Sequence, residues 1–335
     1  MCSISLEPIP ASSVETAEVS ESTEIVVGDE AGGGQSTKIT ASSCVEYDER
    51  KRVYFSYFQV PANIIGHVIG QKSKQIHAIQ VASDARIKVP KKSGASSETI
   101  EIFADAVYKV ERARDLLELD LLKARQSARP THFVAFPLSR HAALCDAYAQ
   151  LVRRIRECVE LPEECREENL FRPLEKLHLT VSVLRLFTEE DERVAKNSLN
   201  EFVEQAMQKL LNGAKSIRVC FPGLGFFGTE ASKARVVYAR AESDILQTIA
   251  DAMDDWLTKR TGLAVERDTP NVTLHMTMLN VKHGNIKTVD AEELMSRFGN
   301  VELPAVDISE IRICLMNEVD PYTNGHPTIF STSFV

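Results

Sequence analysis

Apolar residues follow no sustained period over residues 1–49, and a clear alternation begins directly afterwards. Ser, Thr, Glu and Gly dominate this first segment, which includes the run AGGGQS at 31–36. A segment of this composition buries too little apolar surface to offset the conformational entropy that folding removes. We therefore predict that residues 1–49 form a disordered acidic tail.

The hydrophobic pattern of residues 50–128 alternates between the period of a strand and that of a helix. Aromatic and β-branched residues in RVYFSYFQVP predict a strand. Ser73 stands where it can cap the second of two helices. The pattern predicts strands over 52–61, 85–90 and 99–105 and helices over 63–70, 71–84 and 106–126, in the order β-α-α-β-β-α.

Residues 129–335 show a second mixture of strand and helix periods, which makes the whole chain α+β. Thr188 and Ser243 are placed to cap two helices, and Gly213 and Gly262 follow the ends of these helices. Two apolar segments, 216–228 and 234–242, predict a hairpin. Further strands are expected over 131–139, 176–183, 272–279, 301–317 and 328–334, and helices from Leu144 to Val159 and over 188–213, 243–262 and 291–298.

Charge is unevenly distributed along the chain, whose formal net charge is −9. Residues 1–45 carry a net −6, residues 50–126 a net +6 and residues 127–335 a net −6. A basic module therefore lies between two acidic regions. Because phosphate backbones attract basic surfaces, any extended nucleic-acid contact is expected on residues 50–126.

Cysteine usage and hydropathy narrow the functional classes further. The seven cysteines are single and contain no Cys-x-x-Cys pair, which favours free thiols in a reducing compartment over a zinc site or a disulfide framework. The first residues, MCSISLEPIP, lack the basic start and apolar stretch of a signal peptide. No apolar run is long enough to cross a bilayer.

Two of the predicted strands carry the same arrangement, Leu-His-apolar-Thr. His178 and Thr180 stand in KLHLTVSV, and His275 and Thr277 stand in VTLHMTML, 97 residues further on. Positions i and i+2 of a strand share a face and lie about 6.5 to 7 Å apart. The histidine and threonine of each motif therefore point the same way, while their apolar neighbours point to the core. The repetition indicates an internal duplication with one motif in each half.

If the two halves face each other, two imidazoles and two hydroxyls converge on one cleft. One neutral histidine can take a proton from an attacking hydroxyl or water, and the other, protonated, can donate to the leaving oxygen. Threonine hydroxyls can hold the phosphoryl oxygens. This pattern indicates phosphodiester cleavage without a metal or another cofactor, because no cluster of ligands at metal spacing accompanies the pair.

Other interpretations remain open at this point. A single His-x-Thr on a strand is usually structural, although two copies with matching flanks are harder to attribute to packing. His132 stands in the strand over 131–139 and could line the same cleft. GLGFFG at 223–228 lacks the Gly-Lys-Ser/Thr of a nucleotide loop, so we interpret it as a bent hairpin.

The segment IIGHVIGQKSKQIHAIQ, within the β-α-α-β-β-α order, resembles a type I KH domain. KH domains approach a nucleic-acid backbone with a Gly-x-x-Gly loop between two helices. The resemblance implies that Gly70, Gln71, Lys72, Ser73 and Lys74 bind nucleic acid. Ser73 replaces the second glycine, and its Cβ hinders close approach. The alternative is a KH fold that serves as a protein-docking scaffold.

Residues 129–335 resemble the two-histidine (2H) phosphoesterase superfamily, whose mark is a pair of His-x-Ser/Thr strands in a bilobal fold. The resemblance implies catalytic roles for His178, Thr180, His275 and Thr277. Known members cleave cyclic phosphates, 2′,5′-linked oligonucleotides or RNA 3′ ends. The resemblance does not assign the acid and the base.

The combination of a KH module with a 2H domain is similar to a family of subunits of a nuclear transcription-coactivator complex. That resemblance implies a nuclear location, a large helicase as partner, RNA or single-stranded nucleic acid as ligand, and a link to repair of alkylated nucleic acid. Two functions remain in competition: an RNA phosphodiesterase, and a catalytically silent RNA-binding scaffold within the complex.

Overall fold

The computed structural model describes residues 45–90, 96–284 and 286–334. Most of the predicted tail lies outside these residues. Residues 46–48, which the sequence pattern placed in the tail, form the short strand β1 (Glu46–Asp48), paired antiparallel with β2 (Val53–Pro61). The buried side chains separate into one large cluster in the KH region and one in the region of the His-x-Thr strands.

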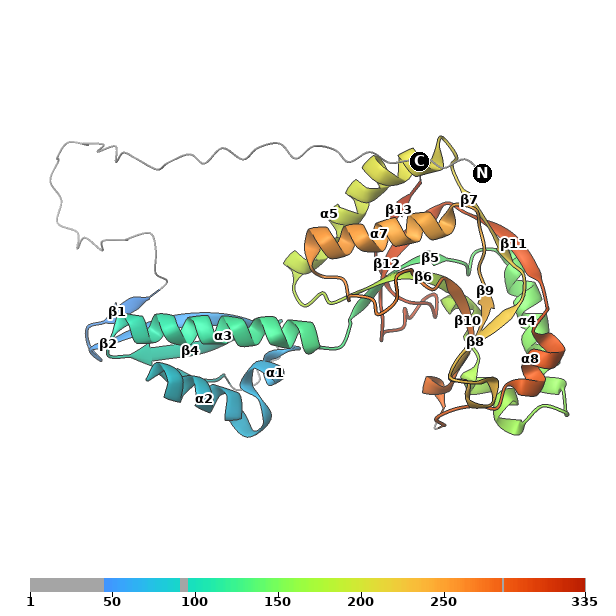
Figure 1. Ribbon diagram of the computed structural model, residues 1–335. Helices are drawn as coiled ribbons and strands as arrows, with labels where there is room; N and C mark the ends of the chain where they lie inside the picture. Colours follow the sequence, from blue (N-terminus) through green and yellow to red (C-terminus); the bar gives the residue numbers. More distant parts are fainter. Residues whose placement is uncertain (1–44, 91–95, 285, 335) are drawn as a thin grey trace. The chain divides into compact units, whose positions relative to one another are not determined.

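The KH region contains a four-stranded antiparallel sheet in the order β1-β2-β4-β3 (Figure 1). Apolar residues of the helices and of the inner sheet face form one core, which includes Val60, Ile76, Ile102 and Leu117. The predicted β-α-α-β-β-α order is confirmed and is preceded by β1. Its elements are β2 (Val53–Pro61), α1 (Ile65–Ile69), α2 (Lys74–Ser83), β3 (Arg86–Lys88), β4 (Ser97–Ala104) and α3 (Val107–Ser127).

The remaining residues build a seven-stranded antiparallel sheet in the order β13-β12-β5-β6-β10-β9-β8. Two long helices, α5 (Glu189–Phe202) and α7 (Leu246–Thr261), pack against each other beside this sheet (Figure 1). The strands of the large sheet are β5 (His132–Pro137), β6 (His178–Leu184), β8 (Leu224–Phe227), β9 (Val236–Arg240), β10 (His275–Asn280), β12 (Glu310–Leu315) and β13 (Thr328–Ser333). Beside it stand a two-stranded sheet, β7 (Ile217–Phe221) with β11 (Leu303–Ile308), and the helices α4 (Ala142–Glu157), α5 (Glu189–Phe202), α6 (Gln208–Leu211), α7 (Leu246–Thr261) and α8 (Glu292–Phe298).

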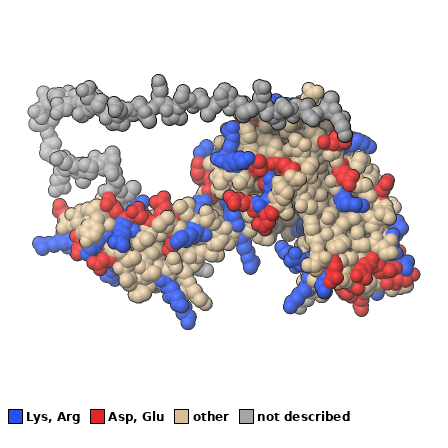
Figure 2. Space-filling view, in the orientation of Figure 1, with Lys and Arg blue, Asp and Glu red and all other residues tan. Residues whose placement is uncertain are grey.

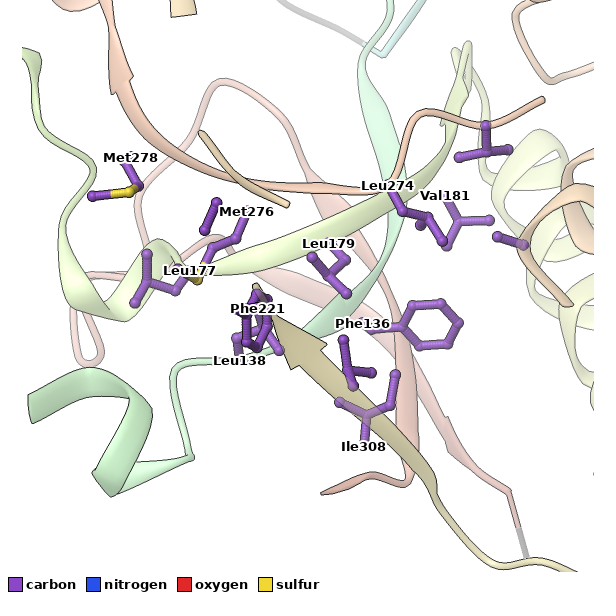
Figure 3. Packing of buried hydrophobic residues seen from close by; sticks show 14 of the residues in the cluster. Phe136, Leu138, Leu177, Leu179, Val181, Phe221, Leu274, Met276, Met278 and Ile308 are labelled. Carbon is purple, nitrogen blue, oxygen red and sulfur yellow. The ribbon is translucent and has the colours of Figure 1, made fainter. Parts of the chain in front are cut away.

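The residues between the histidine and threonine of each motif point into the hydrophobic core. Leu179 of β6 and Met276 of β10 are 0% exposed, and Figure 3 shows them among aliphatic and aromatic residues contributed by several strands. Burying side chains of this size stabilises a fold by about 1.5 to 3 kcal/mol each. This burial fixes which face of each strand points away from solvent.

Local capping agrees with the sequence at some helix ends and differs at others. Thr188 accepts a hydrogen bond from the backbone N–H of Asp191, whose carboxylate accepts one from Thr188 N–H, so α5 begins with a full capping box. A π-helical turn over 203–207 separates α5 from α6 where one helix was predicted. Ser243 is not a cap, because α7 begins after Ile245. Gly262 does end α7, with a φ of 64°.

Two further predictions were wrong. The hairpin expected from 216–228 and 234–242 is divided, because β7 pairs with β11 and only β8 pairs with β9. Pro222 has no N–H for a ladder, and Gly223 has a φ of 148°, so the chain leaves one sheet and enters the other there. Val159 lies beyond the end of α4 and is 77% exposed.

Candidate active site and nucleic-acid loop

The two His-x-Thr strands are neighbours at the centre of the seven-stranded sheet. β6 and β10 run antiparallel, and Leu179 pairs with Met276. Partners in an antiparallel pair advance in opposite directions, so His178 lies across from Thr277. The sequence predicted that each motif shares one face. It did not predict that the two motifs are paired directly with each other.

The second histidine obeys the same relationship, with His275 across from Thr180. All four motif side chains are partly exposed, whereas the residue between the members of each motif is buried. The two histidines are diagonal neighbours on this face, a relationship that separates side chains by about 7 to 8 Å. The four predicted residues are thus brought together on one patch of the sheet.

Each motif histidine is oriented by a backbone carbonyl two residues upstream. His178 Nδ1 is 2.7 Å from the carbonyl oxygen of Lys176, and His275 Nδ1 is 2.6 Å from that of Thr273. A carbonyl oxygen only accepts, so each Nδ1 carries the proton and donates it. Each neutral ring therefore presents Nε2 as a basic lone pair, which is the form required of a general base.

Aromatic rings surround the two imidazoles differently. The ring of Phe133 lies 4.8 Å from that of His178, centroid to centroid. The ring of His275 lies 4.9 Å from Phe227 and 5.2 Å from Tyr238. Phe227 belongs to the GLGFFG segment, of which Leu224–Phe227 form β8, the part of the predicted hairpin that does pair with β9. The packing holds both imidazoles in place and removes water from their flanks.

Burial lowers the pKa of both motif histidines. The pKa of His178 falls to about 3, first through burial and then through the positive charge of Arg172. The pKa of His275 is also lowered from its ordinary value by burial, with a further contribution from Arg172. Both rings are therefore neutral at pH 7 in the unliganded protein. A bound phosphoryl group would reverse part of this shift, because a nearby negative charge favours the protonated form.

Arg172 and His326 stand at the site, although the sequence pattern did not mark them. The ring of His326 lies 5.5 Å from that of His178 and 4.9 Å from that of Phe133. Arg172 precedes the first motif by six residues, and His326 lies between β12 and β13. Neither has a motif partner in the sequence, so only the fold reveals them.

The structure excludes one alternative that the sequence left open, that His132 lines the cleft. This side chain is 4% exposed, and its Nδ1 is 2.8 Å from the hydroxyl of Thr131. Burial lowers its pKa, with smaller effects from Glu192, Lys196 and Glu318. Alternation along β5 puts His132 on the face of the core residue Val134, opposite Phe133, whose ring lies against His178. His132 therefore faces the helical side of the sheet and not the motif face.

Among the residues that the structure describes, no group of three or more His, Cys, Asp or Glu side chains is placed to hold a metal ion.

The predicted nucleic-acid loop connects α1 to α2 in the KH region. Gln71, Lys72, Ser73 and Lys74 are exposed, and Figure 2 shows basic side chains projecting from this region among acidic ones. Gly70 has a φ of 74° and a ψ of 167°, a conformation open to glycine, and a Cβ there would lie 2.9 Å from the Cβ of Gln75. The first glycine is therefore required by the backbone.

Ser73 adopts a left-handed backbone conformation, which glycine reaches without strain. Its φ is 60° and its ψ is 22°, and Lys72 is left-handed as well, with a φ of 54°. The expected side-chain cap of α2 by Ser73 was wrong, because the hydroxyl makes no capping hydrogen bond. A left-handed non-glycine residue costs about 1 to 2 kcal/mol. The loop geometry is thus retained at the expense of backbone strain.

A groove of about 350 Å³ runs along α1 just before this loop. Ile65 and Ile69 supply apolar lining, His67 adds an exposed imidazole, and Pro90 and Glu98 also line the groove. Short apolar grooves beside a basic loop suit unstacked bases whose phosphates follow the loop.

In the described part of the chain, no helix is both long and apolar enough to span a membrane.

Comparison with known proteins agrees with both halves of this description. A family model described as "AKAP7 2'5' RNA ligase-like domain" matches residues 130–329, and one described as "KH domain" matches residues 56–119. Activating signal cointegrator 1 complex subunit 1 of Mus musculus is 24% identical over 225 residues, or 66% of this chain. The chain spans 61% of the length of that relative. The expected resemblance of the domain combination is therefore confirmed.

Two solved structures are similar to part of this chain. The structure of TT0787 from Thermus thermophilus has a TM-score of 0.41 and 16% identity, covering 61% of this chain and 97% of that one. Escherichia coli LigT in complex with 3'-AMP has a TM-score of 0.41 and 14% identity, with coverage of 61% and 97%. Since the first family match takes up more than half of the sequence, this chain belongs to the AKAP7 2'5' RNA ligase-like domain family, with a KH domain preceding the matched region.

Proposed function

We propose that this chain is a metal-independent phosphodiesterase of the two-histidine type that acts on RNA ends or on short or cyclic nucleotide phosphodiesters. The observation that carries the proposal is the direct pairing of the two motifs, which sets His178 across from Thr277 and His275 across from Thr180. Two basic Nε2 atoms and two hydroxyls then surround one position. A phosphoryl group at that position has an imidazole on either side, as in-line displacement requires.

The surroundings of the two imidazoles favour one assignment of roles. His178 has the more strongly lowered pKa, so its ring stays neutral over a wider pH range and acts as the base toward the attacking hydroxyl or water. His275 is protonated more readily and donates to the leaving oxygen. Thr180 and Thr277 donate hydrogen bonds to the non-bridging oxygens, where negative charge develops.

The KH domain supports a nucleic-acid substrate. Its loop at Gly70, Lys72, Ser73 and Lys74 contacts the phosphate backbone, and the groove beside α1 holds bases. The name of the mouse relative describes a subunit of the activating signal cointegrator 1 complex. By analogy we assign this chain to a corresponding complex in the nucleus, with its helicase subunit as partner and with roles in transcription coactivation and alkylation repair.

Purified protein should be incubated with end-labelled RNAs, single-stranded DNAs and cyclic-phosphate nucleotides in the presence of EDTA. Cleavage should persist in EDTA and should disappear in His178→Ala and His275→Ala. His141→Ala is the matched control, because this histidine lies at the start of α4 and makes no capping bond. Mass spectrometry of product ends separates transesterification, which leaves a cyclic phosphate, from hydrolysis.

Two outcomes would contradict this function. Full cleavage by both histidine variants would remove the motifs from the chemistry. Binding of RNA by the wild type without turnover of any substrate would favour the silent scaffold instead.

A further inference from the structure

Within the described residues, three buried polar atoms at the candidate site lack a hydrogen-bond partner. They are Nε of Arg172 and both ring nitrogens of His326. The backbone of Leu315 has a minor effect on the pKa of His326, but it makes no hydrogen bond of normal geometry with the ring. Buried donors and acceptors are nearly always paired, because an unpaired group loses its hydration without compensation. Orphan groups of this kind, gathered beside the two motifs, indicate that a ligand completes the site.

Arg172 is also a partly buried cation that no described carboxylate neutralises. Within the described residues its guanidinium forms no ion pair, and burial lowers its pKa from the ordinary value. Its charge lowers the pKa of His178, His275 and His326, so the guanidinium lies within electrostatic reach of all three rings. Placing an unpaired charge there costs free energy that an anionic ligand would recover.

The backbone of Arg172 is held in place independently of its side chain. Its N–H donates to the carbonyl of Met278 on β10 over 2.7 Å, and its carbonyl accepts from the hydroxyl of Tyr148 over 2.7 Å. Tyr148 is 2% exposed. Met278 directly follows Thr277 in β10. Two hydrogen bonds therefore anchor the Arg172 backbone beside the motif strand β10.

His326 reaches the site from the other direction. It follows Gly325 in the loop between β12 and β13, and its ring stands edge-on to both His178 and Phe133 at interplanar angles of 83°. No corresponding imidazole contacts His275 among the described residues, and the ring neighbours of His275 are Phe227 and Tyr238. The two halves of the duplication therefore differ in polarity at their histidines.

We propose that Arg172 and His326 form a phosphate-binding subsite on the His178 side of the site. The guanidinium donates to phosphoryl oxygens, and His326 donates a further hydrogen bond from a ring nitrogen. This inference rests on the proposed function for the identity of the ligand as a phosphoryl group. The group is either the scissile phosphodiester or a terminal phosphomonoester next to it, and both offer the same oxygens to these donors.

Binding of inorganic phosphate to the full chain, measured by titration calorimetry, tests the subsite without requiring turnover. Arg172→Gln should weaken phosphate binding by about tenfold or more, as expected for a lost charge-assisted hydrogen bond. His326→Phe keeps a ring against Phe133 but has no nitrogen, and should weaken binding several-fold. Arg166→Gln is the matched control, since Arg166 also has a buried Nε without a partner but lines a separate hollow beside α4.

The inference is overturned if the wild type does not bind phosphate, or if Arg172→Gln and His326→Phe bind it as tightly as the wild type. Equal weakening in Arg166→Gln would overturn it as well. Near-ultraviolet circular dichroism of each variant shows that the fold is retained. If no substrate is cleaved but these binding differences appear, the proposed catalytic function fails and the subsite stands.

Oligonucleotides that end in a 3′-phosphate or a 3′-hydroxyl identify the source of the phosphoryl group. If Arg172→Gln removes the wild type's preference for phosphorylated ends, the subsite takes the terminal phosphate. If Arg172→Gln lowers kcat equally for oligonucleotides with a 3′-phosphate and with a 3′-hydroxyl, the subsite binds the scissile phosphate. Either result supports the subsite, whereas unchanged kinetics on both ends would contradict it.

Discussion

Leu179 of β6 pairs with Met276 of β10, and this antiparallel register sets His178 across from Thr277 and His275 across from Thr180. The pairing makes one site from two sequence repeats, and neither motif is complete without the other. Its consequence is that a change in one strand should impair a step assigned to the other.

Replacing Thr277 with valine should lower kcat by about 10²- to 10³-fold, because it removes one hydrogen-bond donor to the oxygens that gain charge in the transition state. Valine has nearly the same shape, so the core at Met276 should be undisturbed. Thr277→Ser keeps the hydroxyl and should retain most of the rate. Single-turnover kinetics on one RNA substrate would measure both variants. Equal rates for the valine and serine variants would contradict this role.

If His275 is the general acid, the rate loss caused by His275→Ala should depend on the leaving group of the substrate. With RNA, His275→Ala should lower the rate by about 10²- to 10⁴-fold, the usual contribution of a general acid. With a p-nitrophenyl nucleotide diester, the leaving group needs little protonation, and the same variant should lose far less. His178→Ala should be impaired on both substrates. The reverse pattern would exchange the two roles.

The pH dependence of kcat/KM should show an optimum below pH 6.5. The active form needs a neutral His178, whose pKa is lowered to about 3, and a protonated His275, whose pKa is lowered below its ordinary value of about 6.5. As the pH rises above the pKa of His275, this form is lost. Initial rates between pH 4 and 8 at low substrate concentration would show it. A rate that still increases above pH 7 would contradict the assignment.

Stability should fall as the pH drops from 7 to 5. Burial, followed by the charge of Arg172, lowers the pKa of His178 to about 3 and that of His326 to about 4, whereas both titrate near 6.5 in the unfolded chain. Below about pH 6.5 the unfolded chain therefore binds more protons than the folded one, which reduces the free energy of unfolding. The contribution of these two histidines to the free energy of unfolding is fully present above pH 6.5. It is lost progressively as the pH falls toward their pKa values in the folded protein.

Urea unfolding at several pH values would measure this slope. His326→Phe removes one of the histidines whose pKa is lowered, so the unfolding midpoint of this variant should fall less steeply over the same range. Most carboxylates stay ionised between pH 7 and 5, which separates the histidine contribution from theirs. Parallel slopes for wild type and variant would exclude His326 as a source.

Ser73→Gly should stabilise the KH region by about 1 kcal/mol, because glycine adopts the observed φ of 60° without the strain of a Cβ. It should also tighten RNA binding by removing an atom between the loop and the phosphates. Gly70→Ala should have the opposite effect, since its Cβ would meet Gln75. Urea unfolding and fluorescence anisotropy with a short labelled RNA would measure both. Weaker binding by Ser73→Gly would show that the serine hydroxyl itself contacts the ligand.

Sequence patterns predicted most elements because strand and helix periods and strong caps are local properties. The capping box of Thr188 and Asp191 and the left-handed Gly262 appear where hydrogen-bonding chemistry and backbone freedom place them. The predicted hairpin of 216–228 and 234–242 was divided, because the choice of partner for β7 depends on β11, which is distant in the sequence. Pairing of distant strands leaves little trace in a local pattern.

The sequence by itself determined the two His-x-Thr motifs, the KH element order and the departure at Ser73, since these depend on residue identity and local period. Only the tertiary structure decided that the motifs lie side by side, that His132 faces the other side of the sheet, and that Arg172 and His326 join the site. Antiparallel pairing and burial bring together residues whose separation in sequence carries no signal. The buried nitrogens of Arg172 and His326 can be identified as unpaired only when the positions of the surrounding atoms are known.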